Sequence, residues 1–221
     1  MPELSFGSLR LRLAPTVYEP AEDSFLLATY ASSLAGKILD MGTGSGIAAL
    51  SAAKASPANN VLGVDINESA LECAKANANF NNASNCSFYY SNLFSGISGS
   101  FDAILFNPPY LPTTHEERMA LGAEDEDGQR KARKGEGLSE GEAENAAYDG
   151  GASGMDVTEQ FIPLAASHLN SGGKLAIIAT SLCEGIEKTE ALLSRHVGKP
   201  KILAEESFFF EKLVLLEAVK E

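Results

Sequence analysis

The stretch GKILDMGTGSG, residues 36–46, joins an apolar strand to a glycine-rich turn. It leads directly into the small-residue segment IAALSAAKA, residues 47–55, which is typical of a helix. Glycines allow a backbone to approach a ligand closely, and the free N–H groups of a helix N-terminus can face that ligand. The stretch therefore predicts a ligand site where a strand of an α/β sheet passes into the next helix.

Strand and helix patterns alternate on both sides of this turn. Further strands are expected in residues 8–13, 60–67, 86–94, 101–106 and 172–180, and two more within 201–220. Further helices are expected in residues 16–35, 68–81, 155–170 and 184–197, with Asn67 or Ser69 as a cap and with Glu22 and Asp23 placed to suit a helix dipole. This alternation predicts one doubly wound α/β domain over residues 1–221, with a parallel sheet and a C-terminal hairpin.

One segment, residues 113–150, interrupts the alternation. It holds eleven acidic residues against five basic ones and has almost no apolar periodicity. Such a composition buries too little apolar surface to order itself, so we expect a mobile charged insertion. Its QRKARK cluster, residues 129–134, is interpreted as a solvated charge run or as a docking patch for an anionic partner.

Composition excludes several classes of protein. The formal net charge of -13 argues against broad electrostatic binding of nucleic acid. No run approaches the roughly 18 apolar residues that a membrane span needs, so a cytoplasmic protein without membrane contact is expected. The spacing of the cysteines and histidines suggests neither a disulfide framework nor a metal site: Cys73, Cys86, Cys183, His115, His168 and His196.

The glycine turn does not have the spacing of a dinucleotide site, because the position expected for the third glycine of G-x-G-x-x-G is Ile47. Two acids stand at strand ends instead, Asp40 before the turn and Asp65 at the end of the next strand. Asp65 could accept both ribose hydroxyls, and Asp40 could hold an ammonium group. Together they favour S-adenosylmethionine as the cofactor, although Asp40 could also cap the following helix and Asp65 could form an Asx turn.

The segment FNPPY, residues 106–110, ends a strand stiffly because its two prolines remove two backbone donors. The Asn107 side-chain oxygen and the Pro108 carbonyl could accept both hydrogens of a planar NH₂ group, while Tyr110 packs on the flat substrate. Such a nitrogen is a poor nucleophile because its lone pair is delocalised. Catalysis must therefore depend on orienting the nitrogen toward the methyl group. The plainer alternative is a stiff loop without a catalytic role.

Five segments in this order resemble the HemK-type protein glutamine methyltransferases, closest to their eukaryotic and archaeal branch: VYEPAEDSFLL, ILDMGTGSG, VDIN, FNPPY and YDGGASGMDVTEQFIPL. The resemblance implies a Rossmann-like class I S-adenosylmethionine-dependent methyltransferase fold with a mostly parallel seven-stranded sheet. It also implies methylation of the glutamine in the Gly-Gly-Gln motif of a class I peptide chain release factor. Members of this branch usually act as a heterodimer with a small zinc-binding activator protein.

The resemblance also implies residue roles. The acceptor amide would lie at Asn107, Pro108 and Tyr110, and the cofactor would contact Tyr18, Ser24, Asp40, Gly42, Thr43, Gly44, Asp65, Ile66, Asn92, Leu93 and Asn107. Asn92 stands where the family often has Asp, and an ordinary turn role is equally open to it. An N-methyltransferase of nucleic acid or protein lysine, or a non-catalytic scaffold, are the alternative functions.

Overall fold

The computed structural model describes residues 2–113 and 149–221. Residue 1 and residues 114–148 lie outside the described part, and with them nearly all of the predicted insertion and its QRKARK cluster. The two ends of the insertion lie side by side, because Thr113 N donates to Gly151 O at 3.0 Å and Gly150 N donates to Leu111 O at 2.9 Å. The described residues on the two sides of positions 114–148 are therefore hydrogen-bonded to each other.

A seven-stranded sheet forms the centre of the domain, in the order β5-β4-β3-β6-β7-β9-β8. Neighbours from β5 to β7 pair in parallel, whereas β9 is antiparallel to both β7 and β8. The strands are β3 (Lys37–Met41), β4 (Asn60–Asp65), β5 (Cys86–Tyr90), β6 (Phe101–Phe106), β7 (Leu169–Thr180), β8 (Lys201–Ser207) and β9 (Lys212–Val219). The predicted mostly parallel sheet with a C-terminal antiparallel hairpin is confirmed.

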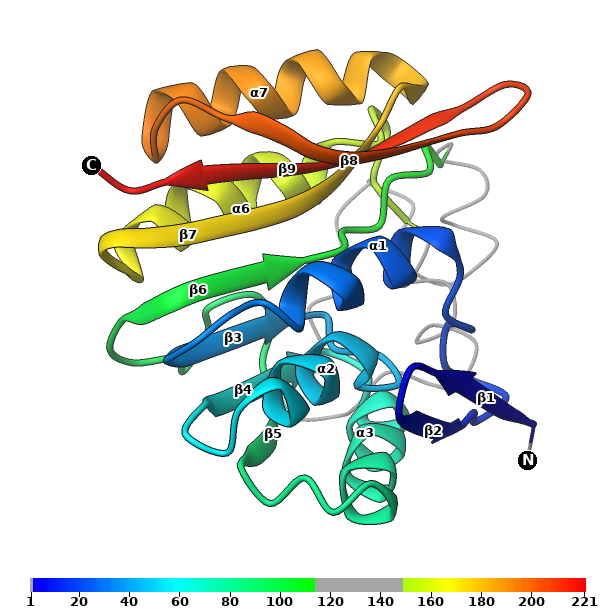
Figure 1. The fold of residues 1–221 in the computed structure, drawn as a ribbon. Helices are drawn as coiled ribbons and strands as arrows, with labels where there is room; N and C mark the ends of the chain where they lie inside the picture. The colour runs from blue at the N-terminus through cyan, green and yellow to red at the C-terminus, as the bar shows by residue number, and fades with distance from the viewer. Residues whose placement is uncertain (1, 114–148) are drawn as a thin grey trace.

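Helices cover both faces of this sheet (Figure 1). One apolar core joins the sheet to α1, α2 and α3, and a second joins it to α6 and α7. The helices are α1 (Glu22–Ala31), α2 (Ile47–Ala55), α3 (Glu68–Phe80), α6 (Asp156–Ser167) and α7 (Gly185–His196), with a short 3₁₀ turn at Leu182–Glu184. Of the two caps predicted for α3, Asn67 or Ser69, the structure has Asn67, whose side chain accepts from Ser69 N. No helix in the two described ranges is long and apolar enough to cross a membrane.

The N-terminus differs from the prediction of a single strand. Strands β1 (Glu3–Phe6) and β2 (Leu9–Arg12) form an antiparallel hairpin separate from the main sheet. The hairpin is fastened to α3, since Asn81 accepts from Arg10 N at 3.0 Å and Asn77 accepts from Arg12 N at 2.8 Å. The chain that follows it carries Tyr18 toward α1.

Candidate active site

Three adjacent parallel strands bring three of the predicted site residues to the same end of the sheet. Met41, the last residue of β3, pairs with Val64 of β4 on one side and with Phe106 of β6 on the other. Gly42, Asp65 and Asn107 each come directly after one of these paired residues. Because the carboxyl ends of parallel strands share an edge, the glycine turn lies between Asp65 and Asn107, at the usual position of a ligand site in such sheets.

The glycine turn adopts a backbone that favours glycine. Gly42 has φ +63° and Gly44 has φ +53°, both in the left-handed region. The turn is fastened to the end of β4, since Thr43 N donates to Val64 O and Gly44 N donates to Asp65 Oδ2, each at 2.9 Å. The side chain of Thr43 is buried beneath the turn.

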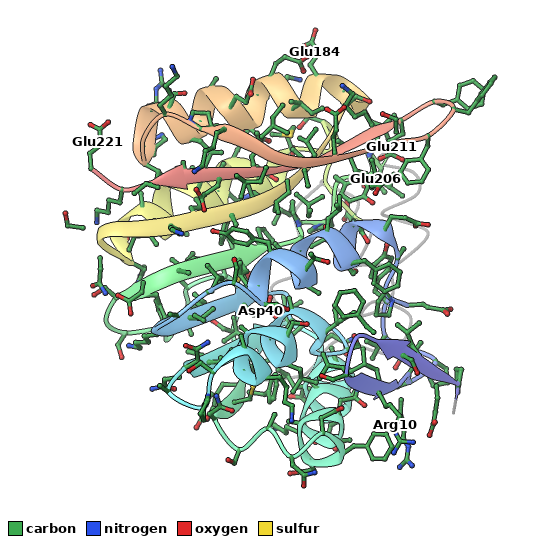
Figure 2. The ribbon with its side chains drawn as sticks, viewed as in Figure 1. Arg10, Asp40, Glu184, Glu206, Glu211 and Glu221 are labelled. Carbon is green, nitrogen blue, oxygen red and sulfur yellow. The ribbon has the colours of Figure 1, made fainter. Side chains whose placement is uncertain are left out.

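Asp40 lies at the centre of the molecule, where β3 passes into α2 (Figure 2). It is only 2% exposed, and its Oδ2 accepts from Thr43 Oγ1 at 2.7 Å and from Ala49 N at 3.1 Å. Burial raises the pKa of Asp40 to about 7 against the lowering effect of these hydrogen bonds. The contact with Ala49 shows that Asp40 does serve the first turn of α2, the alternative considered for it.

Asp65 forms the Asx turn that was the structural alternative to a role in ribose binding. Its Oδ1 accepts from Asn67 N at 2.9 Å, which closes an Asx turn, and its Oδ2 holds Gly44 N. Burial raises the pKa of Asp65, and hydrogen bonds from backbone N–H groups oppose that rise. An ionised carboxylate has about four lone-pair sites, so these two bonds leave it able to accept from a ligand.

The residues predicted to surround the adenine follow β4 and β5. Ile66 is half-buried beside Asp65, and Asn92 is exposed two residues after the end of β5. Leu93 has φ +48° and packs against the second core. The backbone of Asn92 accepts from Ser95 N at 3.0 Å, so this residue also serves an ordinary turn.

Asn107 follows β6 directly, and the nitrogen and oxygen of its side-chain amide lie in different surroundings. Its Nδ2 donates to Asp23 Oδ2 at 2.9 Å. Its Oδ1 is buried and accepts no hydrogen bond from residues 2–113 or 149–221. A buried acceptor without a donor is energetically costly, so this oxygen is free to accept a hydrogen bond. The neighbouring Pro108 is buried, and Tyr110 packs against the first core.

The sequence interpretation missed Asp23 as a site residue and gave it only a helix-dipole role. Asp23 is 2% exposed, whereas its neighbour Glu22 is exposed. Asp23 accepts from the Tyr18 and Tyr110 hydroxyls at 3.0 and 3.2 Å and from Ser24 N at 2.6 Å. The available signal was its position between Tyr18 and Ser24, both of which the family resemblance had selected.

The polar side chains of the site are carboxylates and amides. No group of three or more His, Cys, Asp or Glu residues in the described ranges is arranged to hold a metal ion. The three cysteines are unpaired with one another. The polar groups at this end of the sheet are the buried carboxylates of Asp23 and Asp40, the half-buried carboxylate of Asp65, a glycine turn and the Asn107 Oδ1.

Solved structures with the same fold come from several methyltransferases. A structure of the E. cuniculi Mtq2–Trm112 complex, whose description assigns it methylation of the translation termination factor eRF1, matches with a TM-score of 0.64 and 22% identity over 93% of this chain and 99% of that one. A Pyrococcus furiosus methyltransferase matches with a TM-score of 0.67 and 20% identity over 98% of this chain and 91% of that one. At these identities the structures establish the class I methyltransferase fold alone.

Sequence comparison identifies the family as well as the fold. A relative from Methanocaldococcus jannaschii, named "Putative protein N5-glutamine methyltransferase MJ0928", is 36% identical over 97% of this chain and 98% of its own length. A release factor glutamine methyltransferase from Aliivibrio fischeri is 42% identical over 48% of this chain, which spans only 39% of that protein. The family described as "Methyltransferase small domain" matches residues 21–123. The chain belongs to the HemK-type protein glutamine methyltransferases, an enzyme family.

Proposed function

We propose that this enzyme transfers a methyl group from S-adenosylmethionine to the side-chain amide nitrogen of glutamine in the Gly-Gly-Gln motif of a class I peptide chain release factor. The buried Oδ1 of Asn107, which has no donor among the described residues, carries the proposal. The names of the two relatives support glutamine as the acceptor and a release factor as its carrier.

The carboxyl edge of the sheet suits S-adenosylmethionine, which supplies a methyl group on a sulfonium centre. Asp40, Gly42, Thr43 and Gly44 would hold its amino acid portion, because the left-handed turn brings backbone close to a buried carboxylate. Asp65 would accept from the ribose hydroxyls. The adenine would lie against Ile66, Asn92 and Leu93, and Tyr18 and Ser24 would flank the methionine end.

The acceptor nitrogen would lie beside Asn107 and Pro108. One amide hydrogen of glutamine would be donated to Asn107 Oδ1 and the other to the Pro108 carbonyl, which would fix the plane of the amide. Tyr110 would pack on that plane. Orientation is the main contribution of these residues, because an amide nitrogen with a delocalised lone pair gains most from being aligned with the methyl group. The proton of the product nitrogen can leave late, so a strong general base is unnecessary.

Cofactor affinity is expected to fall below neutral pH. The pKa of Asp40 is raised to about 7, so acidification neutralises the carboxylate that would hold the ammonium group. The dissociation constant measured by calorimetry should rise roughly 15-fold from pH 7.0 to 5.5, because the ionised fraction of a group with that pKa falls by about this factor. The Asp40→Asn variant should bind weakly with little pH dependence over this window. An equal pH dependence in both proteins would contradict the role of Asp40.

A small zinc-binding activator protein is the proposed partner, and β5 is the proposed contact. Among the described residues, β5 is an edge strand of the sheet. Its Tyr89 and Tyr90 side chains are 62% and 53% exposed. An exposed aromatic edge strand invites pairing with another chain. The Mtq2 structure of the same fold is itself that of a complex with Trm112.

The isolated enzyme should therefore be poorly soluble or weakly active, and co-expression with such an activator should correct this. Replacing Tyr89 and Tyr90 by lysine should abolish co-purification, because charged side chains oppose strand addition at an edge. Ile202→Lys on β8, 47% exposed at the opposite edge, is the matched control and should leave co-purification intact. A fully active and monodisperse enzyme without any partner would argue against an obligatory activator.

Labelled S-adenosylmethionine and a panel of acceptors test the function itself. The panel contains a release factor, the same factor with its Gly-Gly-Gln glutamine replaced by alanine, histone, tRNA and DNA, each with and without the activator. Label is expected only on the unaltered release factor. Equal labelling of the factor that lacks this glutamine, or labelling confined to histone or nucleic acid, would overturn the proposal in favour of another acceptor nitrogen.

A further inference from the structure

The Asp23 carboxylate is a meeting point of hydrogen-bond donors next to the proposed acceptor site. Tyr18, Asn107 and Tyr110 all donate to its Oδ2, and Ser24 N donates to its Oδ1. We infer that Asp23 is a positioning residue, which determines which atom of the Asn107 side chain faces the acceptor nitrogen. The inference rests on the proposed function, because it assigns the orientation of the group that would receive the acceptor's hydrogen.

The chemistry of the two groups gives the reason. An ionised carboxylate can only accept hydrogen bonds, so the atom of Asn107 that lies 2.9 Å from it must be the donor Nδ2. The acceptor Oδ1 is then turned away from Asp23, and it is the atom left without a donor among the described residues. The two ends of an amide have nearly the same shape, so packing alone selects between them poorly.

If the side-chain amide of Asn107 were flipped by 180°, its NH₂ group would face the NH₂ group of the acceptor glutamine. Two donors would then face each other, and the acceptor nitrogen would lose the hydrogen bond that aligns it. Asp23 excludes this arrangement, and it is itself held from several sides by Tyr18, Tyr110 and Ser24. The residue thus links the start of α1 to the loop after β6, 84 residues later in the chain.

An exchange of the two side chains tests the inference. Asp23→Asn should lower kcat at least tenfold with little change in KM, because the amide of Asn107 is no longer held in one orientation. Asn107→Asp alone should also be impaired, since it places two carboxylates side by side. In the double variant Asp23→Asn, Asn107→Asp, an amide faces a carboxylate again and position 107 presents an acceptor. Its kcat should exceed that of either single variant at least tenfold.

Glu22→Gln is the matched control, because it removes an exposed carboxylate from the same first turn and should leave kcat unchanged. The assay uses the activator-bound enzyme and any acceptor that the wild type methylates. The inference would be overturned if the kcat of the double variant were as low as two independent effects predict. It would also be overturned if Asp23→Asn lowered cofactor affinity and thermal stability as strongly as it lowered kcat.

A second measurement needs no acceptor, so it separates this inference from the proposed function. In protein labelled with ¹⁵N at asparagine, Asn107→Ala identifies the side-chain NH₂ signals of Asn107. These protons should exchange slowly with water in the wild type and at least tenfold faster in Asp23→Asn, because their buried partner Asp23 has lost its charge. Equal exchange in both proteins would contradict the positioning role, whatever the substrate proves to be.

Discussion

Asn107→Ala is expected to lower the turnover of Gly-Gly-Gln methylation by about 10²- to 10³-fold, the usual effect of losing one preorganised hydrogen bond in a transition state. The Asn107 Oδ1 that would be lost is buried and has no donor among the described residues. The fold should hardly change, because Asn107 follows the last residue of β6. Single-turnover methylation measured beside calorimetric cofactor binding should show a much larger change in rate than in affinity.

Asn60→Ala provides the control for this variant, since Asn60 is exposed at the amino end of β4, on the opposite edge of the sheet. It should turn over at the wild-type rate. Asn107→Asp should keep partial activity, because its carboxylate retains acceptor geometry while adding charge beside Asp23 and the sulfonium. Near-normal turnover of Asn107→Ala would reduce the N-P-P-Y segment to a stiff loop and remove the catalytic assignment.

Asp65→Ala is expected to weaken S-adenosylmethionine binding at least tenfold. Hydrogen bonds to a charged acceptor contribute roughly 1.5 to 3 kcal/mol each, and two ribose hydroxyls would lose theirs. The structure adds a second cause, because Asp65 also holds Gly44 N of the glycine turn at 2.9 Å. Loss of that bond would loosen the turn that is proposed to hold the amino acid portion. Calorimetry on the purified variant measures the effect.

Asp65→Asn separates the two causes. Its side chain keeps one acceptor oxygen, which can hold either Gly44 N or a ribose hydroxyl, so its affinity should lie between those of the wild type and Asp65→Ala. Thermal unfolding of both variants shows whether the turn or the whole domain has been weakened. Unchanged affinity in Asp65→Ala would place the cofactor elsewhere and undo the argument from strand ends.

Local patterns in the sequence predicted most of the elements of this fold. The helix predicted at residues 47–55 is α2, Ile47–Ala55, because a glycine turn marks its start and small apolar residues continue to its end. Asn67 was recognisable as a cap because its side chain bonds only two residues ahead. The turn after β3 and the prolines after β6 likewise act on their own backbone, so the residues at those strand ends could be named in advance.

Contacts between distant segments could not be predicted in the same way. Periodicity does not give strand order, so either β4 or β5 could have formed the edge, and only the sheet assigns that place to β5. Strand β1 was missed because a four-residue strand with mixed burial has little pattern of its own and is ordered by pairing with β2. Burial also raises the pKa of Asp40 to about 7, and burial depends on packing from both sides of the sheet.

Asp23 shows the same division within the site. Its sequence position explains why an acid is tolerated in the first turn of α1, where the helix dipole favours negative charge. Its contact with Asn107 joins residues 84 positions apart. The sequence alone determined the element types, the glycine turn and the residues at the strand ends, because these depend on neighbours along the chain. Tertiary structure alone decided which side chains meet, which carboxylates are buried and which amide atom remains unsatisfied, because these depend on segments that only folding brings together.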